Sequence, residues 1–278
     1  RALELNPNSV DSMLGIAAIL EASRELGEAE SLLRRAIDLQ PGNWRSIDAL
    51  GALYHYSGRY EEAARAYRQV VLLDPKNWMG HGNLGSSLLM MGDFENAAHA
   101  LNVSLSIQRD AYFLSSLGTI HYYLGDYERA AKIHRDAADL LPAVNFVWLN
   151  LGDSLRFTST PEEAAIAYEE AVSTSVDLLE TNPNNAFDLY VRSWAEASLG
   201  NVGTAEQLVA QALELAPGDP NAHYYSALLK LVQGDKSAAL ESLRVAVDRG
   251  YPVKMLASDP LIIELRGLEE FGKLVEEN

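Results

Sequence analysis

The chain has 278 residues, of which 48% are hydrophobic, enough to bury a substantial core in one large domain or two ordinary ones. Its 22 lysine and arginine residues against 39 aspartate and glutamate residues give a formal charge of -17, which disfavours binding to nucleic acid or anionic lipid. There is no cysteine and no apolar run long enough to span a bilayer, which excludes disulfides, thiolate chemistry and direct membrane insertion for this segment.

A leucine-glycine pair recurs along the chain and sets its organisation. The last three intervals between its glycines are 34, 33 and 34 residues. A period of this length predicts stacked supersecondary units, each too small to bury its own apolar face. The seven positions in this register, which we call the anchors, are Gly15, Gly51, Gly85, Gly118, Gly152, Ser193 and Ala227.

Turn-forming residues keep a fixed distance from the anchors. Glycine permits a tight turn between the two helices of a repeat, and proline ends the second of these helices. An alanine twelve residues after the anchor and apolar residues such as Tyr67 and Val70 give the second helix one apolar face. Each repeat therefore reads as helix, turn, helix, turn. Seven residues after the anchor stand Gly58, Gly92, Gly125, Gly200 and Gly234, and at twenty-four stand Pro75, Pro142 and Pro217.

This pattern resembles the tetratricopeptide repeat family over nearly the whole chain. The resemblance implies an all-α, right-handed superhelical solenoid of helix-turn-helix repeats. Residues 1–7 would end the helix of an earlier repeat, since "RALELNPN" matches "QALELAPG" at 211–218 in five of eight places, and residues 252–278 would form a helical cap. The seven expected repeats are 8–41, 44–77, 78–110, 111–144, 145–183, 186–219 and 220–251.

Two departures from the family pattern carry expectations. The interval from Gly152 to Ser193 is 41 residues, and seven extra residues add about two helical turns without rotating the face. We therefore expect a longer second helix in the fifth repeat. The tryptophan that the family places before the anchor occurs at Trp148, whereas His81 and His223 stand at the same place in other repeats.

The sequence offers no convincing motif for catalysis. The stretch "GHGNLG" at 80–85 has the G-x-G-x-x-G spacing of a dinucleotide-binding turn, but no strand precedes it, and Gly85 is an anchor on a helix expected to reach about Met91. No P-loop, G-x-S-x-G or paired-histidine motif occurs, and Glu61-Glu62 suits the first turn of a helix. We predict no enzyme and no catalytic, metal or cofactor site.

The inner, concave face offers a binding surface. The resemblance places that face on the first helix of each repeat, at six places around the anchor. These places hold eleven of the 23 aromatic residues, where chance would give three or four. Aromatic side chains supply contact area to a bound peptide or helix, although each could instead pack against the neighbouring first helix. The predicted groove residues are Tyr56, Met79, Asn83, Tyr112, Tyr122, Tyr123, Phe146, Asn150, Arg156, Phe157, Phe187, Tyr190, Trp194, Tyr224 and Tyr225.

More detailed expectations follow for this groove. Asn83 and Asn150 would hydrogen-bond a ligand backbone, and Gly82 would leave a shallow notch beside Met79. No lysine lies three residues before an anchor, which argues against capture of an acidic chaperone tail. The strongest patch should lie on repeats four to seven. Binding should weaken, with helicity intact, on alanine substitution of Tyr123, Phe157, Tyr190 and Trp194.

The predicted function is a module that binds a protein or peptide partner. The alternative is a structural, sensory or oligomerisation domain that self-associates. The fifth repeat and the stretch "GYP…SDPLIIELRGLEEFGKL" resemble repeat domains of bacterial multidomain signalling proteins, which follow a kinase, an adenylate cyclase or a winged-helix regulator. A cytoplasmic location is favoured, and a periplasmic one would follow from an upstream membrane-spanning helix.

Overall fold

The structure is a computed structural model that describes residues 8–276, and every regular element in that range is helical. The chain divides into two compact units, unit 1 (residues 1–109) and unit 2 (residues 110–278). The predicted end of an earlier repeat helix at residues 1–7 lies outside the described range. Among the described helices, none has the length and apolarity needed to cross a membrane.

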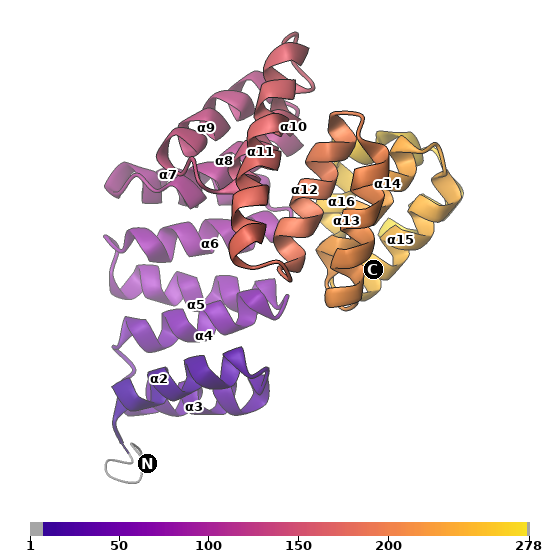
Figure 1. The fold of residues 1–278 in the computed structure, drawn as a ribbon. Coiled ribbons are helices and arrows are strands. Elements are labelled where there is room, and N and C mark those ends of the chain that lie inside the picture. The colour runs from indigo at the N-terminus through magenta and orange to yellow at the C-terminus, as the bar shows by residue number, and fades with distance from the viewer. Residues whose placement is uncertain (1–7, 277–278) are drawn as a thin grey trace. The chain divides into compact units, whose positions relative to one another are not determined.

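Unit 1 consists of three antiparallel helix pairs, drawn from indigo to magenta in Figure 1. The two helices of each pair pack on each other, and the second helix of the first two pairs also packs on the first helix of the next pair. The pairs are α2 (Val10–Ala22) with α3 (Leu26–Leu39), α4 (Trp44–Tyr56) with α5 (Tyr60–Leu73), and α6 (Trp78–Met90) with α7 (Phe94–Ile107).

Unit 2 continues the same arrangement with four helix pairs and a C-terminal segment of short helices. One hydrophobic cluster runs through the unit from α9 to α17. The pairs are α8 (Ala111–Tyr123) with α9 (Tyr127–Leu140), α10 (Asn145–Leu155) with α11 (Pro161–Thr181), α12 (Ala186–Ser198) with α13 (Val202–Leu215), and α14 (Pro220–Val232) with α15 (Lys236–Asp248). The segment contains α16 (Val253–Ser258), η1 (Pro260–Leu265) and α17 (Glu269–Glu276).

The anchor glycines let the two helices of a pair approach closely. A Cβ atom at Gly51 would lie 2.8 Å from the ring of Tyr67, and one at Gly118 would lie 2.5 Å from the ring of His134. Comparable clashes would occur at Gly85 and Gly152. At Gly15 nothing lies within 4 Å, so the expected close approach holds for four of the five anchor glycines.

The turn glycines adopt the backbone conformation that the sequence pattern requires. The five glycines that lie seven residues after an anchor have φ between 69° and 87°, a region that L side chains rarely occupy. In the first repeat, whose turn is two residues longer, Arg24 takes this role with φ of 60°. Glycine therefore suits the turn in five of the seven repeats, whereas the turn of the fifth repeat contains no residue with positive φ.

Helix α11 has 21 residues, whereas the second helices of the other repeats have 13 or 14. The seven-residue excess in the fifth repeat thus extends the helix, as predicted. Ser175, the first residue of the added turns, is buried. The Ser175 hydroxyl accepts a hydrogen bond from Asn145 Nδ2 at 3.0 Å, which ties the extension to the start of α10.

Candidate functional site

The predicted groove residues divide between the two units and differ widely in exposure. In unit 1, Tyr56 is 81% exposed and Met79 is 40% exposed, while Asn83 is half-buried. In unit 2, Tyr112 is 53% exposed and Phe187 is 40% exposed. Of the other predicted groove residues in unit 2, Arg156 is exposed. The half-buried ones are Tyr123, Phe146, Asn150, Phe157 and Tyr225, and the buried ones are Tyr122, Tyr190, Trp194 and Tyr224.

The first helices of unit 2 join their aromatic side chains into one continuous row, which we call the aromatic ladder. The ring centroids of consecutive members lie 5.0 to 6.1 Å apart, with stacked, tilted and edge-to-face geometry. Such pairs contribute about 0.5–1.5 kcal/mol beyond their area burial. The ladder runs across α8, α10, α12 and α14 through Tyr112, Phe146, Phe187, Tyr190 and Tyr225.

The far end of the ladder is covered by the chain itself. Tyr225 contacts Tyr224, and the ring of Tyr224 stacks on that of Tyr251 with centroids 4.7 Å apart. The Tyr251 hydroxyl is also hydrogen-bonded to Tyr123 on α8. Tyr251 therefore bridges the first and last repeats of unit 2, a role that sequence reasoning missed because this tyrosine lies outside the first helices.

A second aromatic cluster lies at the C-terminal end of α8. Tyr127 stacks on Phe157 with centroids 4.7 Å apart, and Tyr122 packs against both rings. Phe157 and Tyr123 are half-buried, whereas Tyr122 is 7% exposed. These predicted groove residues thus contribute mainly to packing inside unit 2.

Two carboxylates lie among these aromatic residues. Asp153 Oδ1 accepts hydrogen bonds from Tyr168 at 2.8 Å and from Trp194 Nε1 at 2.9 Å. Asp259, 1% exposed, accepts from Tyr224 and from the Leu261 backbone amide. Burial raises the pKa of each carboxyl to about 6, and the charge of Asp153 contributes to the increase at Asp259. The sequence did not predict Asp259 as part of this cluster, because the residues after the last repeat do not follow the repeat pattern.

The two asparagines expected to bind a ligand backbone form hydrogen bonds between neighbouring repeats. Asn83 Nδ2 donates to Asp48 Oδ1 at 3.3 Å, and Asn150 Nδ2 donates to Ser115 Oγ at 3.1 Å. In each bond the donor lies two residues before the anchor of its repeat. The acceptor lies three residues before the anchor of an earlier repeat, the one that directly precedes it. Gly82, where a notch was expected, is buried.

A histidine replaces the family tryptophan without losing its hydrogen bond. Trp148 Nε1 donates to the Pro142 carbonyl at 2.9 Å. His81 and His223 place Nε2 at 3.1 and 3.0 Å from the carbonyls of Pro75 and Pro217, at the same spacing in the repeat. The polar residues at this position are therefore accommodated by the proline turn that ends the preceding repeat.

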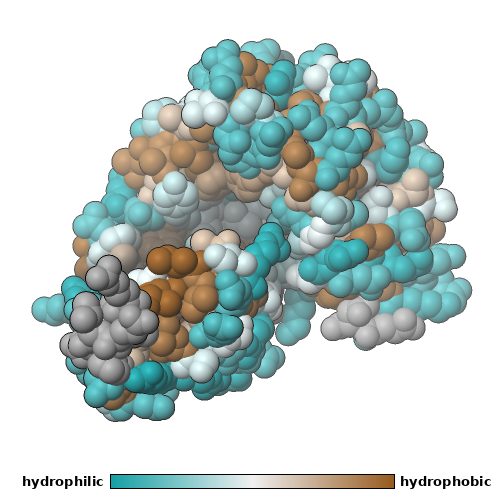
Figure 2. Space-filling view, turned by 60° about the horizontal axis from the view of Figure 1, so that its bottom comes forward, coloured by the Kyte–Doolittle hydropathy of each residue, from teal (hydrophilic) through white to brown (hydrophobic). Residues whose placement is uncertain are grey.

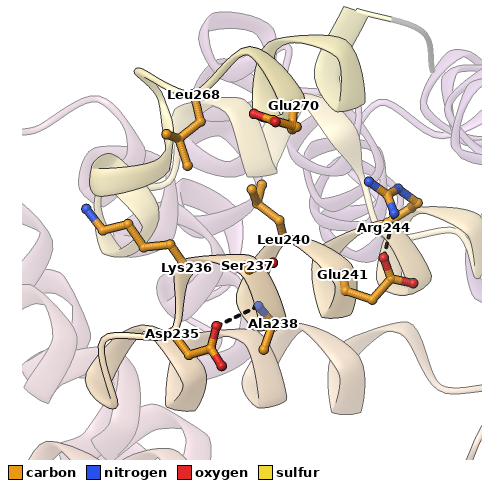
Figure 3. A pocket seen from close by; sticks show the side chains of 9 residues that line it. All are labelled: Asp235, Lys236, Ser237, Ala238, Leu240, Glu241, Arg244, Leu268 and Glu270. Carbon is orange, nitrogen blue, oxygen red and sulfur yellow. Dashed lines mark hydrogen bonds and ion pairs between the residues drawn. The ribbon is translucent and has the colours of Figure 1, made fainter.

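Unit 2 also has an open surface depression of about 700 Å³ between α15 and the start of α17 (Figure 3). Figure 3 shows Leu240 and Leu268 pointing toward each other across it, with Lys236 and Glu270 at its rim. Most of the charged groups that line it have partners within the chain: Arg244 pairs with Glu241, Lys236 pairs with Glu264, and Asp235 accepts from the Ala238 amide. They are therefore not directed together at a ligand, as polar groups of a binding site are. No group of three or more histidine, aspartate or glutamate side chains in residues 8–276 could hold a metal ion.

Comparisons with known proteins agree with this architecture. The sequence model of the tetratricopeptide repeat family matches residues 1–43, 49–112, 116–183 and 190–252. A search of curated protein sequences finds no match to the chain.

Similar solved structures share the fold. A tetratricopeptide repeat protein from Parabacteroides merdae is 18% identical with a TM-score of 0.58, covering 96% of this chain and 98% of that one. PilF of Pseudomonas aeruginosa is 18% identical with a TM-score of 0.58, covering 78% and 96%. The Cut9-Hcn1 complex of the APC/C contains a chain 18% identical with a TM-score of 0.65, covering 83% and 44%. Since the family model covers most of the sequence, the chain belongs to the tetratricopeptide repeat family.

Proposed function

We propose that this protein is a non-catalytic interaction module that binds an extended segment of a partner protein along the aromatic ladder of unit 2. The observation that carries the proposal is the ladder itself, whose Tyr112 and Phe187 expose about half of their side chains while their neighbours hold them in place. Rigid aromatic rings provide contact area at little cost in conformational entropy. The tetratricopeptide repeat family supports the general role of a protein-binding scaffold.

Charge supports a partner that is not acidic. Unit 2 contains 26 aspartate and glutamate residues against 12 lysine and arginine residues, a formal charge of -14, and unit 1 holds the remaining -3. A field of this sign attracts a basic segment and repels an acidic one. It also repels nucleic acid, so a protein segment is the proposed ligand.

The test must use the exposed ladder residues. Tyr190 and Trp194 are each 3% exposed, so alanine there would open cavities and destabilise the fold instead of only weakening binding. We suggest selecting a peptide from a random display library on the whole chain and measuring its affinity by fluorescence anisotropy. The double variant Tyr112→Ala/Phe187→Ala should weaken binding about tenfold or more, as truncation of interface hot spots does.

Ile166→Ala is the matched control, because Ile166 is 58% exposed on α11, a second helix, in the same unit. It should leave affinity unchanged. Circular dichroism should show the same helicity for all variants. If the selected peptide binds the double variant as tightly as the wild type, the ladder is not the binding surface.

A second candidate function is a structural or sensory role based on self-association. Exposed apolar surface favours it: Ile19 on α2 is 66% exposed, and Figure 2 shows patches of hydrophobic surface between hydrophilic regions on the face that it draws. A place in a bacterial multidomain signalling protein would fit this role. Light scattering on the chain decides between the two functions, since a monomer at all concentrations contradicts self-association.

A further inference from the structure

We propose that a small cavity on unit 1 binds the carboxylate of a glutamate side chain from a partner protein. This inference goes beyond the proposed function, because it concerns the other unit and a partner group of negative charge. Three observations carry it: a cavity with apolar walls, hydrogen-bond donors without partners at its edge, and a local excess of positive charge.

The first observation is the cavity itself, which we call the α3–α5 cavity. It has a volume of about 280 Å³ and is lined by residues of α3, α4 and α5. Its apolar walls are fixed by helix packing, since Leu50, Tyr54 and Ala66 are only 4 to 7% exposed. The volume lies at the lower end of the range of about 300–1,000 Å³ for ligand pockets, which suits a single side chain. The polar residues of the lining are Arg34, Glu62, Arg65 and Gln69.

This cavity is separate from the predicted groove. Its residues Leu50 and Tyr54 lie on α4, one residue before and three residues after the anchor Gly51. Neither place belongs to the six around the anchor from which the inner face was predicted. The remaining lining residues lie on α3 and α5, the second helices of their repeats.

The second observation concerns the donors, of which Arg34 is held in place with one nitrogen unused. Its Nε and Nη2 atoms donate to Glu30 Oε1 at 3.0 and 2.8 Å, and Nη2 also donates to the Tyr54 hydroxyl at 2.7 Å. Nη1 has no partner among residues 8–276. The guanidinium therefore keeps a defined position in which one nitrogen still offers two N–H groups.

The other two donors also lack a close partner. Arg65 lies 4.0 Å from Glu61, beyond hydrogen-bonding distance, and both side chains are mostly exposed. The side-chain amide of Gln69 has no hydrogen-bond partner within the part of the chain that the structure describes. The depression beside α17 differs in this respect, because most of its charged groups pair within the chain. The donors at the α3–α5 cavity thus remain available to an acceptor from outside.

The third observation is that the local charge favours an anion. Residues 34–69 contain six arginines and four acidic residues, a formal charge of +2 in a chain whose total is -17. Glu62 is the acidic residue of the lining, and its charge is offset because Arg59 Nε donates to its carboxylate at 2.9 Å. A small anion is therefore attracted to this place, whereas the charge of the whole chain repels a polyanion such as nucleic acid.

These features select a carboxylate on a short aliphatic stem. Its two acceptor oxygens match the planar N–H groups of arginine. The methylene groups of a glutamate would contact Leu50 and Ala66 while the carboxylate reaches the donors. The Arg34 and Arg65 side chains are 59% and 65% exposed, so one such ion pair is weak by itself. It gains strength as one of several contacts made by a longer partner segment.

The site can be probed with a blocked amino acid. We suggest titrating the whole chain with N-acetylglutamate N-methylamide at pH 7 and constant ionic strength. The reporters are the side-chain amide resonances of Gln69, assigned with Gln69→Leu. A saturable shift is expected, and the blocked glutamine compound, which has the same shape without the charge, should bind roughly tenfold more weakly. Tighter binding of inorganic phosphate than of the glutamate compound would overturn the assignment to a carboxylate.

Removing either arginine should weaken binding of the glutamate compound about fivefold, as for the stronger exposed ion pairs. The variants are Arg34→Gln and Arg65→Gln. Arg34→Gln should still fold, because Glu30 keeps its hydrogen bonds from Arg59 at 2.6 Å and from Tyr54 at 2.9 Å. Circular dichroism should show the helicity of the wild type in both variants.

Arg68→Gln is the matched control, because Arg68 is an exposed arginine on α5 that does not line the cavity. It removes the same charge and should change the affinity less than about twofold, since solvent screens a charge without direct contact. An unsaturable response, or wild-type affinity in either Arg34→Gln or Arg65→Gln, overturns the proposal. An equal loss in Arg68→Gln also overturns it, because the response would then report net charge alone.

A longer probe tests whether a partner protein can supply the carboxylate. A blocked pentapeptide with one glutamate between two pairs of alanines should bind at least as tightly as the blocked amino acid. Weaker binding of the pentapeptide would show that the cavity admits only a free small carboxylate, which overturns the proposed source.

These results are distinguishable from a failure of the proposed function. The ladder variant Tyr112→Ala/Phe187→Ala should bind the glutamate compound like the wild type, because both substitutions lie in unit 2. If this variant loses the library-selected peptide while the glutamate titration shows no saturation, the ladder function stands and the cavity site falls. If the selected peptide ignores the ladder, the proposed function fails and the glutamate titration still decides the cavity site.

Discussion

Individual carboxylates in this protein are shifted in opposite directions by their surroundings. Burial alone would raise the pKa of Glu30, but hydrogen bonds from Arg59, Arg34 and Tyr54 outweigh it and lower the value to about 2. Asp153 and Asp259 receive neutral donors instead of a contacting cation, so burial dominates and the pKa of each is about 6. The difference lies in the charge of the donor and not in the acid.

The two raised values predict how stability depends on pH. An aspartate whose folded pKa is about 6 and whose unfolded pKa is about 3.9 stabilises the fold below pH 4, and this stabilisation is lost as pH rises through 6. The facing groups are Tyr168, Trp194 and Arg156 at Asp153, and Tyr224 and Arg266 at Asp259. Burial raises the pKa values of Tyr168 and Tyr224 further above this pH range, so both tyrosines stay neutral throughout it.

We therefore expect Asp153→Asn/Asp259→Asn to be more stable than the wild type at pH 7.5, by about 1–3 kcal/mol. The advantage should shrink toward zero at pH 4.5, where the wild-type carboxyls are protonated in the fold. Urea unfolding at both pH values measures the difference. Comparing the variant with the wild type removes the opposite contribution of His134, whose pKa burial lowers to about 4. A constant difference between the two pH values would contradict the assignment.

At the scale of the helix pair, the anchor position illustrates how close packing selects glycine. The residue sixteen after the anchor lies against it: Tyr67 against Gly51, His134 against Gly118, and Tyr168 against Gly152. A large ring on the second helix therefore requires the absence of a side chain on the first. The His134 imidazole also hydrogen-bonds the Ser154 hydroxyl of the next pair at 2.9 Å, so it cannot easily shift.

Two alanine substitutions test this packing with opposite expected signs. Gly118→Ala would place Cβ 2.5 Å from His134 and should destabilise the protein by about 1–3 kcal/mol through overpacking. Gly15→Ala has nothing within 4 Å and should stabilise helix α2 by up to about 1 kcal/mol through helix propensity. Thermal unfolding of both variants provides the comparison. Equal effects would show that the anchor is selected for helix propensity and not for packing.

At the scale of the whole molecule, unit 2 is closed by a residue far along the chain from its first helix. Tyr251 stacks on Tyr224 of the last repeat and is hydrogen-bonded to Tyr123 of the first repeat of the unit. Asp259 adds a hydrogen bond to Tyr224. The C-terminal segment thus both caps the last repeat and covers part of the inner face that the sequence predicted to be open.

Loss of this bridge should loosen the C-terminal segment. We expect Tyr251→Ala to destabilise unit 2 by about 3–5 kcal/mol, as for removal of other buried aromatic rings, and to speed amide exchange in α16 and α17. Tyr251→Phe keeps the ring and should lose only about 1 kcal/mol with its hydrogen bond. Hydrogen exchange followed by mass spectrometry distinguishes the two. Unchanged protection of residues 253–276 in Tyr251→Ala would show that the segment is held by other contacts.

The sequence by itself determined the repeat architecture. Anchor spacing, turn glycines and closing prolines are local requirements of a helix pair, so they recur at fixed distances and can be read without coordinates. The same reasoning predicted the longer α11, because seven residues preserve the helical face. It also placed the aromatic residues of the ladder on the first helices.

Only the tertiary structure decided which of these side chains remain available. Exposure depends on how strongly successive repeats curve and on where the C-terminal segment lies, and neither follows from a periodic pattern. Tyr122 shares its register position with Ile19 and Arg156, which are exposed, yet contacts inside unit 2 bury it. The predicted groove residues Tyr190, Trp194 and Tyr224 are buried as well. Asp259 and Tyr251 lie outside the repeats, so no sequence spacing predicts their contacts, and only the folded chain brings both of them against Tyr224.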